Sequence, residues 1–193
     1  MNINNILHKN FPNILSVFRI AMSPFIVFLM IHDEVYYKLI SFFLILCVSL
    51  TDALDGYYAR KYNLVSKLGK YLDPIADKFF ILSVLFTLHY LLDSYIPLWM
   101  IMIIFLRDIL VTFLRNIFQK KKLEFRTSRL AKNKTLVQII SIHIIVLLMI
   151  INEYNIYFIN YSIFYYIMLF CSLLTMISGL DYCYQYYTFK NNE

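Results

Sequence analysis

The sequence predicts an all-α integral membrane protein with six transmembrane helices, organised as a single membrane-embedded domain over residues 1–193. Hydrophobic residues make up 61% of the chain, and its mean hydropathy is +0.64, whereas soluble domains are about half apolar. Six apolar stretches approach the roughly 20 residues that a helix needs to cross a bilayer. In addition, 12 of the 18 basic residues gather in two of the segments that connect these stretches.

The expected helices follow one another with short connections. Residues 1–12 mix polar and apolar side chains, and we expect them to form a short segment in the membrane interface. Asn13 and Ser16 are expected to cap the first helix, and Pro24 to kink it. The six expected spans are residues 13–31, 36–55, 73–92, 96–118, 134–151 and 156–187.

The distribution of Lys and Arg predicts the orientation in the membrane. The basic residues concentrate in the connections 56–70 and 115–134, whereas the alternate turns contain only acidic charges. Because cytoplasmic loops are enriched in Lys and Arg, we expect both termini and these two connections on the cytoplasmic side of the cell (inner) membrane. Lys38 lies at the opposite end of its span and departs from this pattern. The net charge of +6 then reflects topology and attraction to anionic membrane lipids, so no nucleic-acid partner is expected.

Four aspartates stand close together in DALDGYYARKYNLVSKLGKYLDPIAD, residues 52–77. On a helix, Asp52 and Asp55 share a stripe about 140° wide with Gly56 and Arg60. Gly69, Asp73 and Asp77 form a second stripe about 80° wide. Since the connection 61–68 is short, the two helices are expected to be antiparallel neighbours whose carboxylates converge at the cytoplasmic end.

A cluster of carboxylates in an apolar chain requires compensation. An ionised side chain at mid-membrane costs at least ~2.5 kcal/mol. Carboxylate oxygens without Cys or His favour Mg²⁺ or Mn²⁺, which keep positions open for phosphate oxygens. Arg60 suits bidentate phosphate contact. Two alternatives remain open: Asp73 before Pro74 could be a helix N-cap, and intramembrane acids also form the relay of cation or proton transporters.

The spacing of these residues resembles the signature of the CDP-alcohol phosphotransferase family. The match covers eight positions over 26 residues: Asp52, Asp55, Gly56, Ala59, Arg60, Gly69, Asp73 and Asp77. The resemblance implies a six-helix enzyme, usually a homodimer, that transfers a phosphatidyl group from a CDP-activated lipid to an alcohol. It also implies two Mg²⁺ or Mn²⁺ ions on the four aspartates, with Asp77 as catalytic base. Gly56, Arg60 and Ser66 would bind the CDP moiety, and we expect Asn13 and Ser16 to border the nucleotide pocket.

Four further stretches extend the likeness: FPNILSVFRIAMSPF, YLDPIADK, FLRDILVTFLRN and AKNKTLVQII. They resemble the bacterial members of this family that use CDP-diacylglycerol and glycerol 3-phosphate in phospholipid biosynthesis. The resemblance implies phosphatidylglycerophosphate and CMP as products. Inositol phosphate, phosphatidylglycerol or serine would use the same four aspartates, so these acceptors remain alternatives.

The phosphate of such an acceptor needs cations. Arg107 lies about 11 residues, or roughly 16 Å, inside the fourth expected span, too deep for a topology charge. Asp108, beside it, is expected to point elsewhere and pair with another helix. Arg115, Lys132 and Lys134 are expected to complete the acceptor phosphate site with Arg107, whereas Lys120, Lys121 and Lys122 are typical topology charges.

Overall fold

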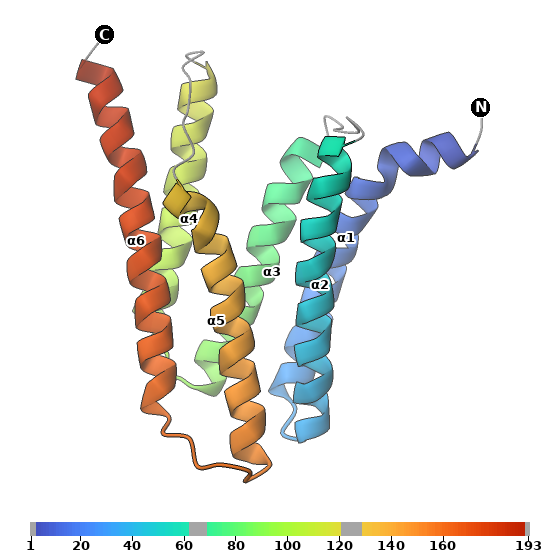
Figure 1. The fold of residues 1–193 in the computed structure, drawn as a ribbon, viewed down its shortest axis with the longest axis vertical. Helices are drawn as coiled ribbons and strands as arrows, with labels where there is room; N and C mark the ends of the chain where they lie inside the picture. Colours follow the sequence, from blue (N-terminus) through green and yellow to red (C-terminus); the bar gives the residue numbers. More distant parts are fainter. Residues whose placement is uncertain (1–2, 62–68, 121–128, 192–193) are drawn as a thin grey trace. The chain divides into compact units, whose positions relative to one another are not determined.

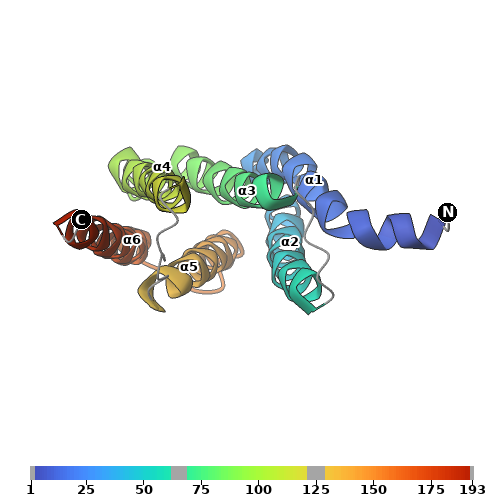
Figure 2. The same cartoon turned by 90° about the horizontal axis from the view of Figure 1, so that it is seen from above.

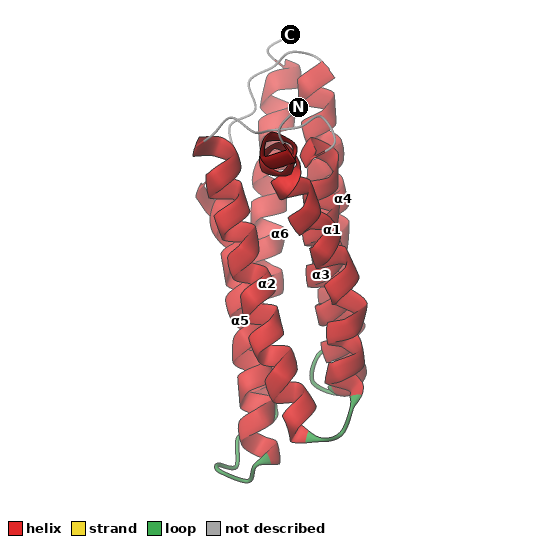
Figure 3. Cartoon of the chain, turned by 90° about the vertical axis from the view of Figure 1, so that its right-hand side faces the viewer, coloured by secondary structure: helices red, strands yellow, loops and turns green. Residues whose placement is uncertain are grey.

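The computed structural model describes residues 3–61, 69–120 and 129–191, and this part of the chain contains only helices and their connections (Figure 3). Its helices follow in order along the sequence (Figure 1). They are α1 (Ile3–Ile31), α2 (Val35–Lys61), α3 (Gly69–Leu91), α4 (Leu98–Lys120), α5 (Arg129–Glu153) and α6 (Ser162–Asn191). The predicted all-α fold is therefore confirmed over the described residues.

The helices carry the apolar surface of a membrane protein. Large side chains such as Phe113 and Phe170 face outward, 64% and 59% exposed, which suits lipid and not water. Within the described residues, four segments are long and apolar enough to cross a membrane: Asn13–Ile31, Leu72–Leu91, Asn133–Glu153 and Ser162–Phe189. The chain is a multi-pass membrane protein. Six spans remain a prediction, because the apolar part of α2 is shorter and charged residues interrupt α4.

The first helix begins earlier than the sequence suggested. α1 starts at Ile3 and continues without interruption through Pro24 to Ile31. The prediction that Asn13 and Ser16 cap this helix is therefore wrong, since both lie in its interior, where backbone N–H groups already have intrahelical partners. Figure 2 shows the first turns of α1 leaving the line of the rest of the helix.

The last helix begins later than the expected residue 156. The chain leaves α5 through Asn155, whose φ of 52° lies in the left-handed region that Asn tolerates. The backbone N–H of Ser162 then donates to Asn160 Oδ1 at 3.0 Å. This contact satisfies one of the N–H groups left without a partner at a helix N-terminus, so α6 starts at Ser162.

Packing divides the chain into two compact units. One comprises Met1–Thr87 and Val146–Phe158, and the other comprises Leu88–Ile145 and Ile159–Glu193. In the first unit α1 packs along α2, with Ile26, Met30 and Ile45 almost fully buried. In the second unit α4 packs along α6 (Figure 1), and its core includes Val111, Leu114 and Tyr182.

A partly buried ion pair joins α2 to the end of α5 within the first unit. Lys38 Nζ donates a hydrogen bond to Glu153 Oε1, and the two side chains are only 10% and 28% exposed. This contact explains why Lys38 departs from the charge pattern of the loops. Lys38 neutralises the charge of Glu153, so its position does not indicate which side of the membrane this end of α2 faces.

We expect Lys38→Met to lower the thermal unfolding midpoint in detergent, because it leaves Glu153 without its partner. Breaking a buried pair costs about 3–5 kcal/mol, and the partial exposure of Glu153 reduces this to about 1–3 kcal/mol. Adding Glu153→Gln to the same chain should recover part of the loss. Glu34→Gln, at an exposed residue, should have little effect. Equal midpoints for the Lys38 and Glu34 variants would contradict a stabilising role for this pair.

Candidate functional site

Asp73 lies inside α3 and contacts α1. Because α3 begins at Gly69 and contains Pro74, Asp73 is not the N-cap residue of this helix. Its Oδ1 accepts a hydrogen bond of 2.5 Å from the Ser16 hydroxyl on α1, where Ser16 is buried. The N-cap alternative is therefore wrong. The contact places Ser16 beside Asp73, and the expected position of Ser16 at the nucleotide pocket stays a prediction.

Asp77 follows one helical turn after Asp73 on α3. Residues four apart lie on one helix face, and both aspartates are half-buried. Gly69, at the start of the same stripe, is buried. The α3 half of the predicted carboxylate pattern is thus in place on a single face of the helix.

The α2 half of the pattern is described only as backbone. Residues 52–61 are helical, as expected, and α2 ends at Lys61. The structure does not describe the side chains of this stretch, which include Asp52, Asp55 and Arg60, or the surroundings of Gly56. Ser66, in the connection to α3, lies outside the described residues. Their assigned roles stay predictions.

The available donors fit a hard divalent cation in their chemistry. Asp73 and Asp77 offer carboxylate oxygens, the ligands that Mg²⁺ and Mn²⁺ prefer. Among the side chains that the structure describes, no three His, Cys, Asp or Glu residues could together hold a metal ion. A metal site at these two aspartates would need further carboxylates, and Asp52 and Asp55 are the ones that the sequence predicts for it.

Arg19 is a charged residue of the first unit that the sequence interpretation missed. It is 2% exposed on α1, three residues after Ser16, and its carbonyl accepts a hydrogen bond of 2.8 Å from the Ser23 hydroxyl. A guanidinium at this position lies well inside the apolar segment Asn13–Ile31. The depth argument that singled out Arg107 would have identified Arg19 as well.

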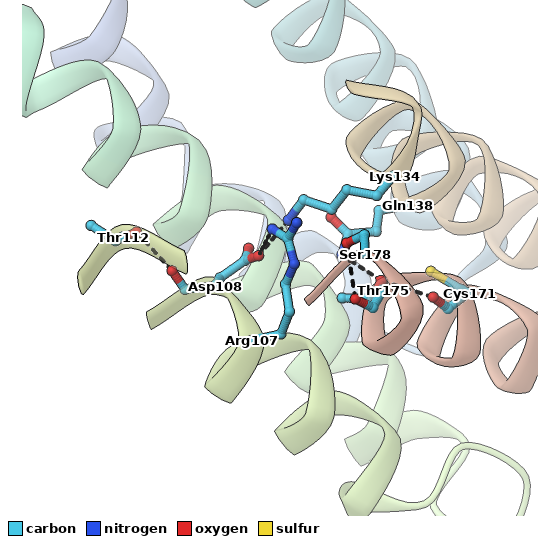
Figure 4. Close-up of polar contacts among 8 residues, drawn as sticks. All are labelled: Arg107, Asp108, Thr112, Lys134, Gln138, Cys171, Thr175 and Ser178. Atoms are coloured by element: carbon cyan, nitrogen blue, oxygen red, sulfur yellow. Dashed lines mark hydrogen bonds and ion pairs between the residues drawn. The ribbon is translucent and has the colours of Figure 1, made fainter. Parts of the chain in front are cut away.

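A second polar cluster lies in the other unit, where α4, α5 and α6 meet (Figure 4). Asp108 Oδ1 accepts a hydrogen bond of 3.0 Å from Arg107 Nη1 and a second one from Lys134 Nζ. All three residues are at most 9% exposed. Asp108 thus pairs with another helix, as expected, but the prediction that it points away from Arg107 is wrong. The triad carries a net charge of about +1 when all three groups are ionised.

The Arg107 side chain is confined on the α6 side as well. Its guanidinium carbon lies 5.4 Å from the ring centroid of Tyr182, within cation–π range. A methyl group built on Gly179 would lie 2.9 Å from Arg107 Cγ, so only glycine leaves room for this side chain. Arg107 Nε and Nη2 are buried and have no hydrogen-bond partner within the described part of the chain. These donors remain available for an anion.

The other three predicted acceptor-binding residues lie on α4 and α5. Lys134 joins Arg107 through Asp108, as described above. Arg115 is exposed on α4, two turns after Arg107. Lys132 belongs to α5, but the structure does not describe its side chain. The structure therefore brings Arg107 and Lys134 together on Asp108, while the acceptor-binding roles of all four residues stay predictions.

An apolar hollow of about 240 Å³ lies beside this cluster, between α4 and α6. Leu106 and Leu180, on its wall, are 57% and 59% exposed, so it opens to the outside of the unit. Its lining residues are Ile103, Leu106, Arg107, Leu110, Met176, Gly179, Leu180 and Cys183. Such a lining suits hydrocarbon, whereas Arg107 Nη1 makes its hydrogen bond with Asp108.

Comparison with known proteins agrees with the sequence signature. A model of the family "CDP-alcohol phosphatidyltransferase" matches residues 9–177, which extends beyond the stretches that carry the resemblance. A Rickettsia bellii protein named CDP-diacylglycerol–glycerol-3-phosphate 3-phosphatidyltransferase is 38% identical over 141 residues, covering 73% of this chain and 77% of that protein. A Bacillus subtilis protein of the same name is 35% identical over 150 residues, covering 72% and 77%. The chain belongs to the CDP-alcohol phosphatidyltransferase family.

Proposed function

We propose that this protein transfers the phosphatidyl group of CDP-diacylglycerol to glycerol 3-phosphate, giving phosphatidylglycerophosphate and CMP. The names of its relatives support both substrates. The observation that carries the choice of acceptor is the pair of buried cations, Arg107 and Lys134, on the Asp108 carboxylate, with two buried Arg107 nitrogens that lack a partner among the described residues. A phosphorylated alcohol offers anionic oxygens to these nitrogens, whereas serine carries no phosphate to bind there.

The donor side of the proposal rests on the aspartate signature. Asp52, Asp55, Asp73 and Asp77 would hold two Mg²⁺ or Mn²⁺ ions, and the hydrogen bond from Ser16 orients the Asp73 carboxylate. When bound, such ions stabilise negative charge on the attacking and leaving oxygens of a phosphoryl transfer. Arg60, Gly56, Ser66 and Asn13 would bind the CDP moiety.

The proposed reaction is a direct displacement. The terminal hydroxyl oxygen of glycerol 3-phosphate forms a bond to the β-phosphorus of CDP-diacylglycerol, and the bond from that phosphorus to the CMP oxygen breaks. Asp77 accepts the hydroxyl proton, and CMP leaves with the electron pair of the broken bond. A carboxylate base near the nucleophile suits this proton transfer.

The location and assembly of the enzyme are part of the same proposal. The basic connections between α2 and α3 and between α4 and α5 support a cytoplasmic position for both termini and for the aspartates. We expect the enzyme to reside in the cell (inner) membrane as a homodimer.

The function is tested by incubating purified protein with CDP-diacylglycerol and a panel of acceptors, and measuring CMP release. Glycerol 3-phosphate should be the best acceptor, ahead of inositol phosphate, phosphatidylglycerol and serine. Free glycerol should be poor, because it leaves the cations without an anion. Cation flux in liposomes without CMP release would instead favour a transporter.

Removing divalent cations should abolish this activity. Exhaustive EDTA treatment should reduce CMP release to background, and added Mg²⁺ or Mn²⁺ should restore it. Asp73→Asn and Asp52→Asn should each lower the rate by at least about a hundredfold while the protein stays folded, because a neutral amide cannot offset metal charge. Turnover that survives chelation, or near-wild-type rates in either variant, would rule out the aspartates as metal ligands.

Replacing Arg107 should impair use of the acceptor more than use of the lipid donor. Arg107→Gln and Lys134→Gln should raise the KM for glycerol 3-phosphate about ten- to a hundredfold, the loss of a charge-assisted hydrogen bond of about 1.5–3 kcal/mol. Arg60→Gln should affect the KM for CDP-diacylglycerol first. Lys121→Gln, at a topology charge, should leave both constants nearly unchanged. If Arg107→Gln behaves like Lys121→Gln, the buried cluster does not bind the acceptor.

Gly179→Ala should act through Arg107. The added methyl group would approach Arg107 Cγ to 2.9 Å, so the guanidinium must shift and the KM for glycerol 3-phosphate should rise about fivefold or more. In an Arg107→Ala background the clash is absent, and Gly179→Ala should then have little further effect, as expected for coupled neighbours. Additive effects of the two substitutions would show that Gly179 does not position Arg107.

A further inference from the structure

Gln138 is a buried amide with one end lacking a hydrogen-bond partner. It lies on α5 and is 1% exposed. Its Nε2 donates to Thr175 Oγ1 on α6 at 3.3 Å, while its Oε1 has no partner among the described residues. The oxygen and nitrogen of an amide can be exchanged in assignment, but whichever of them faces Thr175, the other has no hydrogen-bond partner in the described part of the chain. A buried polar atom without a partner is costly, most of all in a membrane protein.

The neighbouring hydroxyl groups cannot satisfy this atom as they stand. The Thr175 hydroxyl donates its hydrogen to the Cys171 carbonyl at 2.8 Å. The Ser178 hydroxyl donates to the Thr175 carbonyl at 3.0 Å. Both donors therefore serve the backbone of α6, and Gln138 Oε1 keeps no hydrogen-bond partner among the described residues.

The position of Gln138 identifies the kind of ligand. Lys134 lies four residues earlier on the same face of α5, about 6 Å along the helix axis, and donates to Asp108 together with Arg107. Figure 4 shows Gln138 beside Lys134, on the side of α5 that faces Arg107 and Thr175. A phosphate on the two cations would thus have a neutral hydrogen-bonding group nearby. Glycerol 3-phosphate carries a secondary hydroxyl on the carbon atom between its phosphate-bearing carbon and its terminal hydroxyl.

We propose that Gln138 is a specificity-determining residue, whose unpartnered amide end hydrogen-bonds the secondary hydroxyl of an acceptor held by Arg107 and Lys134. A hydroxyl both donates and accepts, so it can pair with either end of the amide. The contact selects acceptors with a hydroxyl next to the phosphate-bearing carbon and leaves the terminal hydroxyl free to react. This inference rests on the proposed function, and it adds a second requirement to the phosphate that the cations bind.

The test compares two acceptors that differ by this one group. 3-Hydroxypropyl phosphate keeps the phosphate and the terminal hydroxyl of glycerol 3-phosphate but lacks the secondary hydroxyl. Wild-type enzyme should use glycerol 3-phosphate with a kcat/KM about ten- to a hundredfold higher, measured as CMP release. Gln138→Met, which keeps the length of the side chain, should remove most of this preference by lowering the rate with glycerol 3-phosphate selectively. The KM for CDP-diacylglycerol should change little.

Ser178→Ala is the matched control, because it removes a nearby hydroxyl that serves only the α6 backbone in the described contacts. It should keep the preference for glycerol 3-phosphate. The proposal is overturned if Gln138→Met slows both acceptors by the same factor or leaves their ratio unchanged. It is also overturned if wild-type enzyme uses the two acceptors equally, a result that needs no variant and leaves the proposed function standing. If neither acceptor supports CMP release, the result would instead count against the proposed function.

Discussion

The cost of placing a charge in an apolar medium constrains every ionisable side chain in these helices. An isolated charge at the centre of a bilayer costs several kcal/mol, so a buried charge must meet an opposite charge, a hydrogen-bond partner or a ligand. Lys38 meets Glu153 in the first unit, and Arg107 and Lys134 share Asp108 in the second. Asp73 accepts a hydrogen bond from Ser16. The polar contacts between the helices are largely the result of this requirement.

The sequence was sufficient to predict the existence of the helices, but it predicted their first and last residues less well. Long apolar stretches separated by polar segments predict helices with little ambiguity, and α2, α3 and α4 begin or end within a few residues of expectation. The start of α1 was missed because residues 3–12 have no continuous apolar pattern, although they still form helix. The start of α6 depends on the turn at Asn155 and on the Asn160 side chain, whereas hydropathy alone continues through this segment. Caps and turns involve single side chains, which averaged hydropathy does not register.

The candidate site was predictable where spacing along one helix determines it. Four residues between Asp73 and Asp77 put both carboxylates on one face, whatever surrounds them. Contacts between helices were not predictable in the same way. The pairing of Ser16 with Asp73 and the room that Gly179 leaves for Arg107 depend on which helices pack together. The direction of Asp108 was predicted wrongly because adjacent residues on a helix point about 100° apart. The long Arg107 side chain can nevertheless reach its neighbour and donate a hydrogen bond to it.

The charge balance of the second cluster bears directly on the acceptor. Two cations share one carboxylate, and Arg107 retains two buried nitrogens without partners in the described part of the chain. A phosphate offers several acceptor oxygens at once, so it can pair with the two unpartnered Arg107 nitrogens while it lies against both cations. A neutral polyol offers no negative charge to these nitrogens, and the zwitterion serine would bring its own ammonium group close to the two cations. The arrangement therefore favours an alcohol that already carries a phosphate.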